Sequence, residues 1–100
     1  MMTGKIEPPK WLERHEKHEF RRIIAARAAL NAPVQAAEIN TLADYVQSRT
    51  RIDHLTILAE KERTRGFTKD YLAATRAVEA AIATSRRLAI DLGLMATPTS

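Results

Sequence analysis

The amino-acid sequence predicts an all-α protein of three helices, in which an N-terminal helix precedes a long antiparallel helical hairpin. Helix-breaking residues divide the 100-residue chain at only a few places, which are Gly4, Pro8, Pro9, Pro33, Gly66, Gly93 and Pro98. Between these breaks, apolar residues recur at the three- and four-residue spacing of a helix. No stretch alternates apolar and polar residues as a half-buried strand does, and no internal repeat is present.

The first predicted helix begins just after Pro8 and Pro9 and runs to about Leu30. On a helical wheel, one side gathers the residues expected to pack, which are Leu12, Glu16, Phe20, Ile23 and Leu30. Almost opposite lies a narrow basic stripe, formed by Lys10, Arg14, Lys17 and Arg21 with Arg22 beside it. We therefore expect one face to pack and the other to meet solvent or a polyanion.

The second predicted helix opens at Asn31 as its N-cap, with Pro33 tolerated in the first turn, and continues to Arg65, where Gly66 closes it. Its apolar stripe comprises Ile39, Leu42, Tyr45, Val46, Ile52, Leu55, Ile57 and Leu58. About 30 residues at roughly 1.5 Å each give a helix of about 45 Å, which is long for a small domain.

The third predicted helix begins with Thr68 as its N-cap and Asp70 in its first turn. Its packing positions are Tyr71, Ala74, Val78, Ala81, Ile82, Leu88, Ala89 and Leu92. We expect Gly93 to end the helix in a left-handed conformation and Leu94 to contact the last turn. Residues 1–94 are thus interpreted as a single helical oligomerisation domain and residues 95–100 as a flexible C-terminal tail.

Alanines lie around most of the circumference of the third helix, at positions that include Ala73, Ala77, Ala80 and Ala83. Small side chains permit close helix packing on more than one side, and one hairpin cannot cover all of this surface. We therefore expect self-association. The alternative is that alanine merely supports helix formation.

The charge of the chain is moderately basic and unevenly distributed. The formal net charge is +4, and residues 1–30 contribute most of it, because seven bases there face four acids. Any attraction to polyanions is therefore expected mainly in the first third. Cysteine is absent and no apolar run approaches the roughly 20 residues that cross a bilayer, so we expect an intracellular protein.

The segment HEKHE invites comparison with the zinc-binding pattern H-E-x-x-H, but His15 and His18 are spaced i, i+3 and the only other histidine, His54, lies in a different predicted helix. We expect no metal site. The glycines are too scattered for a phosphate-binding loop, and the serines lack activating neighbours, so we expect neither a cofactor nor catalysis. Tyr45 and Tyr71 are interpreted as packing aromatics, and Trp11 as a cover for the end of the hairpin.

The order of landmarks resembles the terminase small subunit of tailed double-stranded DNA phages, in the short form that also occurs in phage-like gene transfer agents. The opening PPKWLERHEKHEF resembles the family's P-x-W-L start followed by an acidic helix and an aromatic residue. The segment AEINTLADYVQSRTRID resembles its second helix with a central tyrosine, and LGLMATPTS resembles an ending of the L-G-L-T-P-S type. The resemblance covers nearly the entire chain.

The resemblance implies a helical, ring-forming and non-catalytic regulator of genome packaging in the cytoplasm of a bacterial host cell. Such a subunit presents double-stranded DNA to the large terminase subunit and modulates that partner's ATPase and nuclease. No separate N-terminal helix-turn-helix is present, so we expect weak or nonspecific DNA binding. The segment from Gly93 to Ser100 is the expected docking segment for the large subunit, through Leu94, Met95, Thr97 and Pro98. The alternative is an ordinary frayed chain terminus.

The basic stripe has two interpretations. Its cations can contact phosphates without reading bases, and repetition of such contacts around an oligomer gives strong, salt-sensitive, sequence-independent binding. Alternatively, the stripe is only a solvated helix face. The competing prediction for the whole chain is a small basic helical regulator that binds nucleic acid by itself.

Overall fold

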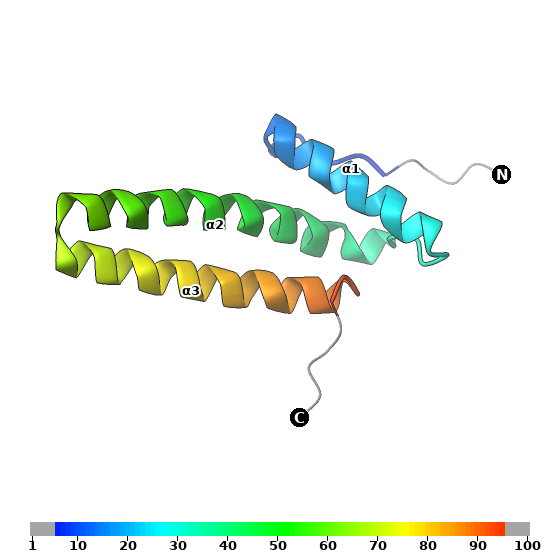
Figure 1. Cartoon of the computed structure of the whole chain (residues 1–100). Helices are drawn as coiled ribbons and strands as arrows, with labels where there is room; N and C mark the ends of the chain where they lie inside the picture. The colour runs from blue at the N-terminus through cyan, green and yellow to red at the C-terminus, as the bar shows by residue number, and fades with distance from the viewer. Residues whose placement is uncertain (1–5, 96–100) are drawn as a thin grey trace, which may run out of the picture.

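The computed structural model describes residues 6–95, and all regular structure within that range is helical. The elements are α1 (Arg14–Ala29), the short 3-10 helix η1 (Ala36–Glu38), α2 (Ile39–Arg65) and α3 (Thr68–Asp91). The predicted order of three α-helices is confirmed. Figure 1 shows α2 and α3 as an antiparallel hairpin, with α1 lying over the half of α2 that is remote from the α2–α3 turn. None of the described helices combines the length and apolar character that a membrane span requires.

The α2–α3 hairpin packs through small side chains. Nine residues of these two helices are buried, and seven of them are alanine or serine: Ala43, Ser48, Ala59, Ala74, Ala81, Ser85 and Ala89. Small residues allow the two helix backbones to approach closely along their length. The molecule measures 60 × 38 × 19 Å. Its smallest extent is thus no greater than the width of two packed helices.

Two glycines end the helices of the hairpin as predicted. Gly66 has φ +79° after α2, and Gly93 has φ +71° after α3, both in the left-handed region that favours glycine. After α3, the Leu94 N–H donates to the Ala89 carbonyl at 2.8 Å, which confirms the contact expected for Leu94. The prediction of Thr68 as an N-cap is wrong by one residue, because Thr68 is already helical and Phe67 precedes it as the cap.

The first helix begins later than predicted, at Arg14 rather than directly after Pro9. The intervening residues form a turn in which the Leu12 N–H donates to the Pro9 carbonyl at 3.2 Å. Glu16 then fixes the start of α1, because its Oε1 accepts a hydrogen bond from the Glu13 N–H at 2.8 Å. Glu16 is 4% exposed, so this capping bond explains why an acid occupies the buried face.

The prediction that Asn31 opens the second helix is also wrong. Asn31 has φ +59° and ends α1, with the Ala32 N–H donating to the Arg27 carbonyl at 3.0 Å. Asparagine adopts this left-handed conformation more readily than most residues, so the same residue type suits either end of a helix. Pro33 consequently lies in the connection, and α2 starts only at Ile39.

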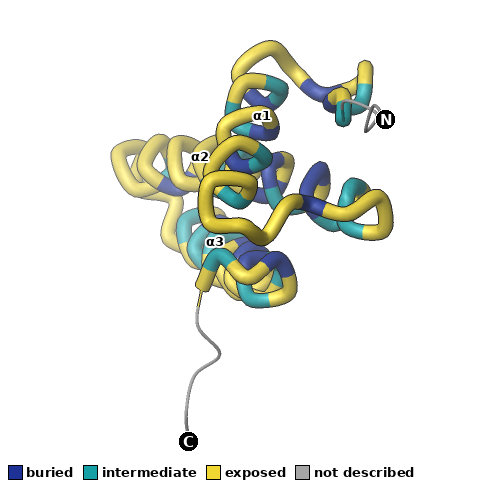
Figure 2. The backbone as a smooth tube through the Cα atoms, turned by 90° about the vertical axis from the view of Figure 1, so that its right-hand side faces the viewer, coloured by how far each residue is buried: buried dark blue, intermediate teal, exposed yellow. Residues whose placement is uncertain are grey.

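The buried core lies where α1, the connection and the open end of the hairpin meet. It comprises Leu12, Phe20, Ile23, Val34, Leu42, Ala43, Val46 and Leu92. Figure 2 shows buried stretches of backbone on α1, α2 and α3. Several residues predicted to pack are instead exposed, because no helix lies over them: Leu30 (77%), Ile57 (55%), Leu58 (45%) and Ile82 (40%).

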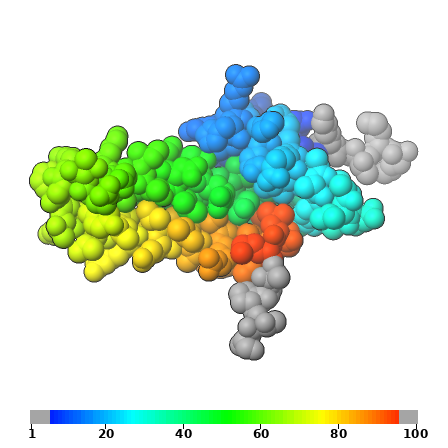
Figure 3. Space-filling view, viewed as in Figure 1, coloured from blue at the N-terminus to red at the C-terminus, as the bar shows by residue number. Residues whose placement is uncertain are grey.

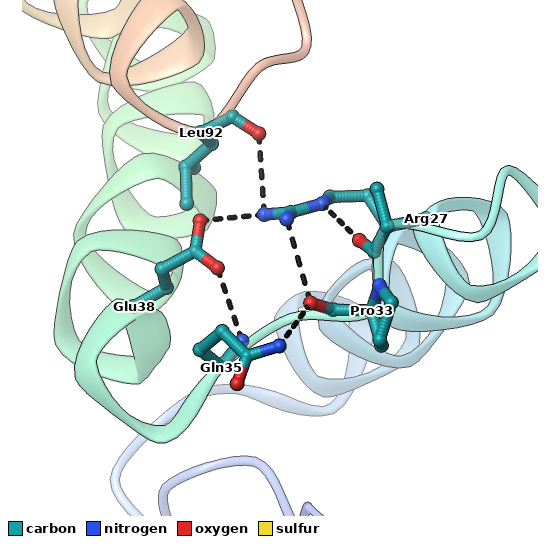
Figure 4. A network of polar contacts seen from close by, with 6 residues as sticks. Arg27, Pro33, Gln35, Glu38 and Leu92 are labelled. Atoms are coloured by element: carbon teal, nitrogen blue, oxygen red, sulfur yellow. Dashed lines mark hydrogen bonds and ion pairs between the residues drawn. The ribbon is translucent and has the colours of Figure 1, made fainter.

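Arg27 joins the connection between α1 and α2 to the end of α3 (Figure 4). Its guanidinium donates to Glu38 Oε2 at 2.6 Å, to the Ala32 carbonyl at 2.8 Å and to the Leu92 carbonyl at 3.3 Å. The hydrogen bond from Arg27, together with one from the Gln35 N–H, lowers the pKa of the Glu38 carboxyl. This network fixes a connection that has little regular structure of its own.

Candidate nucleic-acid interface

The helical part of the basic stripe lies on the outer side of α1. Arg14, Lys17 and Arg21 follow one another at three- and four-residue spacing, which places them along one side of the helix. Phe20 and Ile23 face the core, and Arg14 and Arg21 are exposed. Figure 3 shows α1 as a raised ridge on the hairpin, so a polyanion can approach its outer side.

Lys10 does not belong to the helical stripe as predicted, because it lies in the turn before α1. It is exposed, but its position relative to Arg14 is set by the turn between residues 9 and 13 rather than by helical periodicity. The helix therefore aligns three cations instead of four.

Two cations of the predicted site carry acidic partners. Arg22 forms an ion pair with Glu19, which lowers the pKa of the Glu19 carboxyl and raises the pKa of the Arg22 guanidinium. Arg21 Nη2 lies 3.7 Å from Glu7 Oε2. Lys10, Arg14 and Lys17 form no ion pair within residues 6–95. These three cations are therefore available to phosphate oxygens, with Lys10 and Arg14 exposed and Lys17 half-buried.

Arg27 must be removed from the cations that could attract a polyanion. Its side chain is only 16% exposed, and its guanidinium is directed inward to Glu38 and to backbone carbonyls. The count of bases in the first third therefore overstates the charge presented to solvent, because one of the seven is structural.

The histidines do not gather around a common point. His15 Nε2 lies 3.1 Å from Thr50 Oγ1 of α2, and its Nδ1 lies 3.5 Å from Glu13 Oε2. Within residues 6–95 no three histidine, aspartate or glutamate side chains are grouped as metal ligands. The contact with Thr50 instead links α1 to the middle of α2.

Trp11 does not cover the end of the hairpin as predicted. It is 60% exposed and lines a groove whose other walls include Asp44 and Gln47 of α2 and Thr84 of α3. These positions lie well away from the α2–α3 turn at Gly66. Trp11 therefore borders one face of the hairpin.

The sequence reasoning missed a second basic cluster, which α2 and α3 form together. Arg49 and Arg86 line one shallow hollow with Tyr45, Ile52 and Ile82. The two arginines lie almost equally far from the turn at Gly66, so an antiparallel hairpin brings them side by side. Their similar sequence distances from Gly66 are the signal from which the sequence could have predicted this pair.

The predicted docking segment for a partner is divided by the structure. Leu94 is half-buried and packs against the core, whereas Met95 is 47% exposed beside Tyr45 and Ile82. Thr97 and Pro98 lie outside the described residues. Leu94 thus contributes to the packing of the fold. A deletion that tests docking should therefore start at Met95 and leave Leu94 in place.

Comparisons with protein-family models, curated proteins and solved structures found no match to this chain.

Proposed function

We propose that this chain is a non-catalytic small terminase subunit that assembles into a homo-oligomeric ring. In this role it presents double-stranded DNA to the large terminase subunit and modulates that subunit's ATPase and nuclease. The ordered sequence resemblance, which covers nearly the entire chain, supports the assignment to DNA packaging. The ring and the partner are part of this proposal.

The observation that carries the proposal is the uncovered half of the hairpin. Four large apolar side chains near the α2–α3 turn are between 45% and 55% exposed: Ile57, Leu58, Phe67 and Leu72. Neighbouring exposed apolar side chains on a small protein favour burial against another molecule. A ring of identical subunits gives each hairpin a neighbour on either side and covers such surface.

The basic stripe supports nonspecific contact with DNA. Its cations lie on α1 and, for Lys10, in the turn before it, and the ion pairs of Arg21 and Arg22 are with acids of the same N-terminal region. Cations of this kind bind phosphates and release counterions, which makes the affinity dependent on salt and independent of sequence. Repetition around a ring multiplies these weak contacts.

Stimulation of the large subunit's ATPase tests the proposed function directly. The full chain is titrated into the large terminase subunit encoded by the same phage-like element, with and without double-stranded DNA. We expect a change in ATPase rate that saturates with the concentration of the small subunit. An unchanged rate at saturation, together with no detectable complex, would overturn the proposal.

DNA titrations at several salt concentrations test the basic stripe. The triple variant Arg14→Ala, Lys17→Ala, Arg21→Ala is expected to bind more weakly at low salt and to show a shallower salt dependence, by about one unit of slope for each lost phosphate contact. The matched control replaces three exposed hairpin cations, Lys61→Ala, Lys69→Ala and Arg76→Ala. An equal loss in both variants would indicate a general charge effect rather than a site.

The second candidate is a small basic regulator that binds nucleic acid without forming a ring. Arg14 and Lys17, which form no ion pair within residues 6–95, favour it as much as they favour a terminase component. Mass measurement in solution separates the two. A chain that remains monomeric or dimeric and still binds DNA favours the regulator.

A further inference from the structure

The two broad faces of the hairpin carry different chemistry. One face has the hollow lined by Tyr45, Arg49, Ile52, Ile82, Arg86 and Met95, here called the cationic face. The other has a groove lined by Leu55, Leu58, Glu62, Asp70, Ala73 and Ala77, here called the acidic groove. Both surfaces are formed jointly by α2 and α3, and Met95, which follows α3, also lines the cationic face.

Helical geometry places these two surfaces on opposite sides of the hairpin. Arg49 and Leu58 lie nine positions apart on α2, as do Ala77 and Arg86 on α3. Nine residues correspond to about two and a half turns, so the members of each pair point in opposite directions. One subunit therefore presents the cationic face to one side and the acidic groove to the other.

The surfaces are complementary in charge. Arg49 and Arg86 form no ion pair within residues 6–95, and Glu19, the acid whose pKa Arg49 helps to lower, is already bonded by Arg22. The acidic groove presents Glu62 and Asp70, with Arg65 as the nearest cation to Glu62 at 3.5 Å. Opposite charges on these two surfaces of one chain favour contact between copies and oppose contact of either surface with itself.

One carboxylate oxygen of Glu62 has no hydrogen-bond donor among the described residues. The side chain is 13% exposed, Oε1 receives the contact from Arg65, and Oε2 is buried with no hydrogen-bond partner among the described residues. A buried acceptor without a partner is unfavourable, whereas an arginine can offer two N–H groups to a carboxylate. Glu62 lines the groove, so its carboxylate is close to a donor that enters there.

The shapes are also compatible with a contact between copies. In the acidic groove Leu55 and Leu58 of α2 lie beside alanines of α3, and the cationic face carries Ile82 and Met95, which are 40% and 47% exposed. Small residues below and larger apolar residues above permit interdigitation, with the arginines at the edge. Nucleic acids are polyanions and offer no cation for Glu62, whereas a second copy supplies Arg49 and Arg86 on a surface of complementary charge, so a second copy is the occupant that fits.

We propose that the cationic face of one copy docks into the acidic groove of the next, with an Arg49 or Arg86 guanidinium bonding Glu62. The contact is heterologous, because it joins two different surfaces, and it generates a closed ring or an open filament rather than a two-fold dimer. The two surfaces lie at different heights along the hairpin, so hairpins in a closed ring are inclined to the ring axis. This inference rests on the self-association included in the proposed function.

Reversing the charge of each surface separately tests the contact. The first variant carries Arg49→Glu with Arg86→Glu, and the second carries Glu62→Arg with Asp70→Arg. Each alone places like charges across the contact, and we expect each to sediment and scatter light as a monomer where the wild type forms a larger species. The matched control, Lys61→Glu with Arg76→Glu, changes the charge of α2 and α3 equally outside both surfaces and is expected to assemble like the wild type.

The decisive measurement is the mass of an equimolar mixture of the two reversed variants. In the mixture the reversed cationic face meets the reversed groove, and the two unreversed surfaces also meet, so every contact is again between opposite charges. We expect an alternating assembly to form. Circular dichroism of each variant shows that the helices are intact.

The possible outcomes separate this inference from the proposed function. Assembly of either variant alone, or failure of the folded variants to assemble when mixed, overturns the pairing of these faces while leaving the proposed packaging role in place. A wild-type chain that stays monomeric overturns both the pairing and the ring. Restored assembly without any effect on the large subunit's ATPase supports the contact and counts against the packaging role.

Discussion

The two ends of the α2–α3 hairpin are built differently. At the end covered by α1, large side chains such as Phe20, Leu42 and Leu92 are almost completely buried. Near the turn at Gly66, only alanines such as Ala59 and Ala74 are buried, while the larger apolar residues are exposed. The covered end holds the chain together, and the free end retains apolar surface that another molecule can cover.

Replacing a core phenylalanine is expected to produce the largest difference between the two ends. Phe20→Ala removes a side chain that is 0% exposed, at a cost of about 3–5 kcal/mol in the free energy of unfolding. Phe67→Ala, near the turn, removes a ring that is 48% exposed and costs about 1 kcal/mol. Urea unfolding followed by circular dichroism measures both. Equal losses would contradict the view that stability is concentrated at the covered end.

The next largest effect is expected at Arg27. Arg27→Met removes charge-assisted hydrogen bonds to Glu38 and to the Leu92 carbonyl, at a cost of about 2 kcal/mol in unfolding free energy. Its counterpart near the turn is Arg63→Met, which breaks an ion pair with Glu60 between two well-exposed side chains and is expected to change stability little. A similar loss from both variants would show that exposed and half-buried ion pairs stabilise this fold equally.

The pH dependence of stability sharpens the same comparison. The pKa of Glu38 is lowered in the folded protein, so its contribution is fully present above the ordinary value of 4.5 and is lost as the pH falls through the lowered pKa. Arg27→Met removes the main cause of this shift. We therefore expect the stability difference between wild type and variant to shrink below pH 4.5. A difference that stays constant with pH would show that Glu38 is not the partner through which Arg27 acts.

Alanine at each left-handed glycine is expected to have a smaller effect. Gly66→Ala and Gly93→Ala each place a Cβ where nothing lies within 4 Å, so the cost is conformational and amounts to about 1 kcal/mol. Gly93 follows Leu92, whose carbonyl accepts from Arg27. Thermal unfolding measures both losses. A larger loss at Gly93 than at Gly66 would show that the Gly93 substitution also weakens the hydrogen bond between Arg27 and the Leu92 carbonyl.

Removal of residues 95–100 is expected to change stability least. Leu94 keeps its contact with the core in this variant, so the free energy of unfolding should change by less than about 0.5 kcal/mol. If the tail docks on the large terminase subunit, the variant loses its effect on that subunit's ATPase while its mass in solution stays that of the wild type, which separates docking from loss of the contact that Met95 lines. An unchanged effect would remove the docking role, and Leu94→Ala would separately report the structural contribution of the packed residue.

Much of the fold follows from local signals in the sequence. The helical class, the long hairpin and the stops at Gly66 and Gly93 were predictable, because periodicity and left-handed glycines act within one or two turns. The start of α1 and the role of Asn31 were not. Proline and asparagine are each compatible with several positions around a helix end, and the choice depended on Glu16 and on the Arg27 network.

The candidate interface was predictable only in part. Sequence spacing identified Arg14, Lys17 and Arg21 as neighbours on a helix. It did not reveal that Arg27 is directed inward or that Arg49 and Arg86 meet across the hairpin. Ion pairing and cross-helix neighbours depend on how helices pack, and a charge count along the chain contains neither.

The sequence by itself determined that this protein consists of helices and where the hairpin turns, because those properties are set by backbone preferences and by the spacing of apolar residues. Only the tertiary structure decided which apolar residues became core. Ile23 and Ile57 are equally hydrophobic, but α1 packs over one end of α2 and not over the other, so the first is 3% exposed and the second 55%. Whether a residue is buried depends on which elements pack against it, and the short α1 packs against only half of the hairpin.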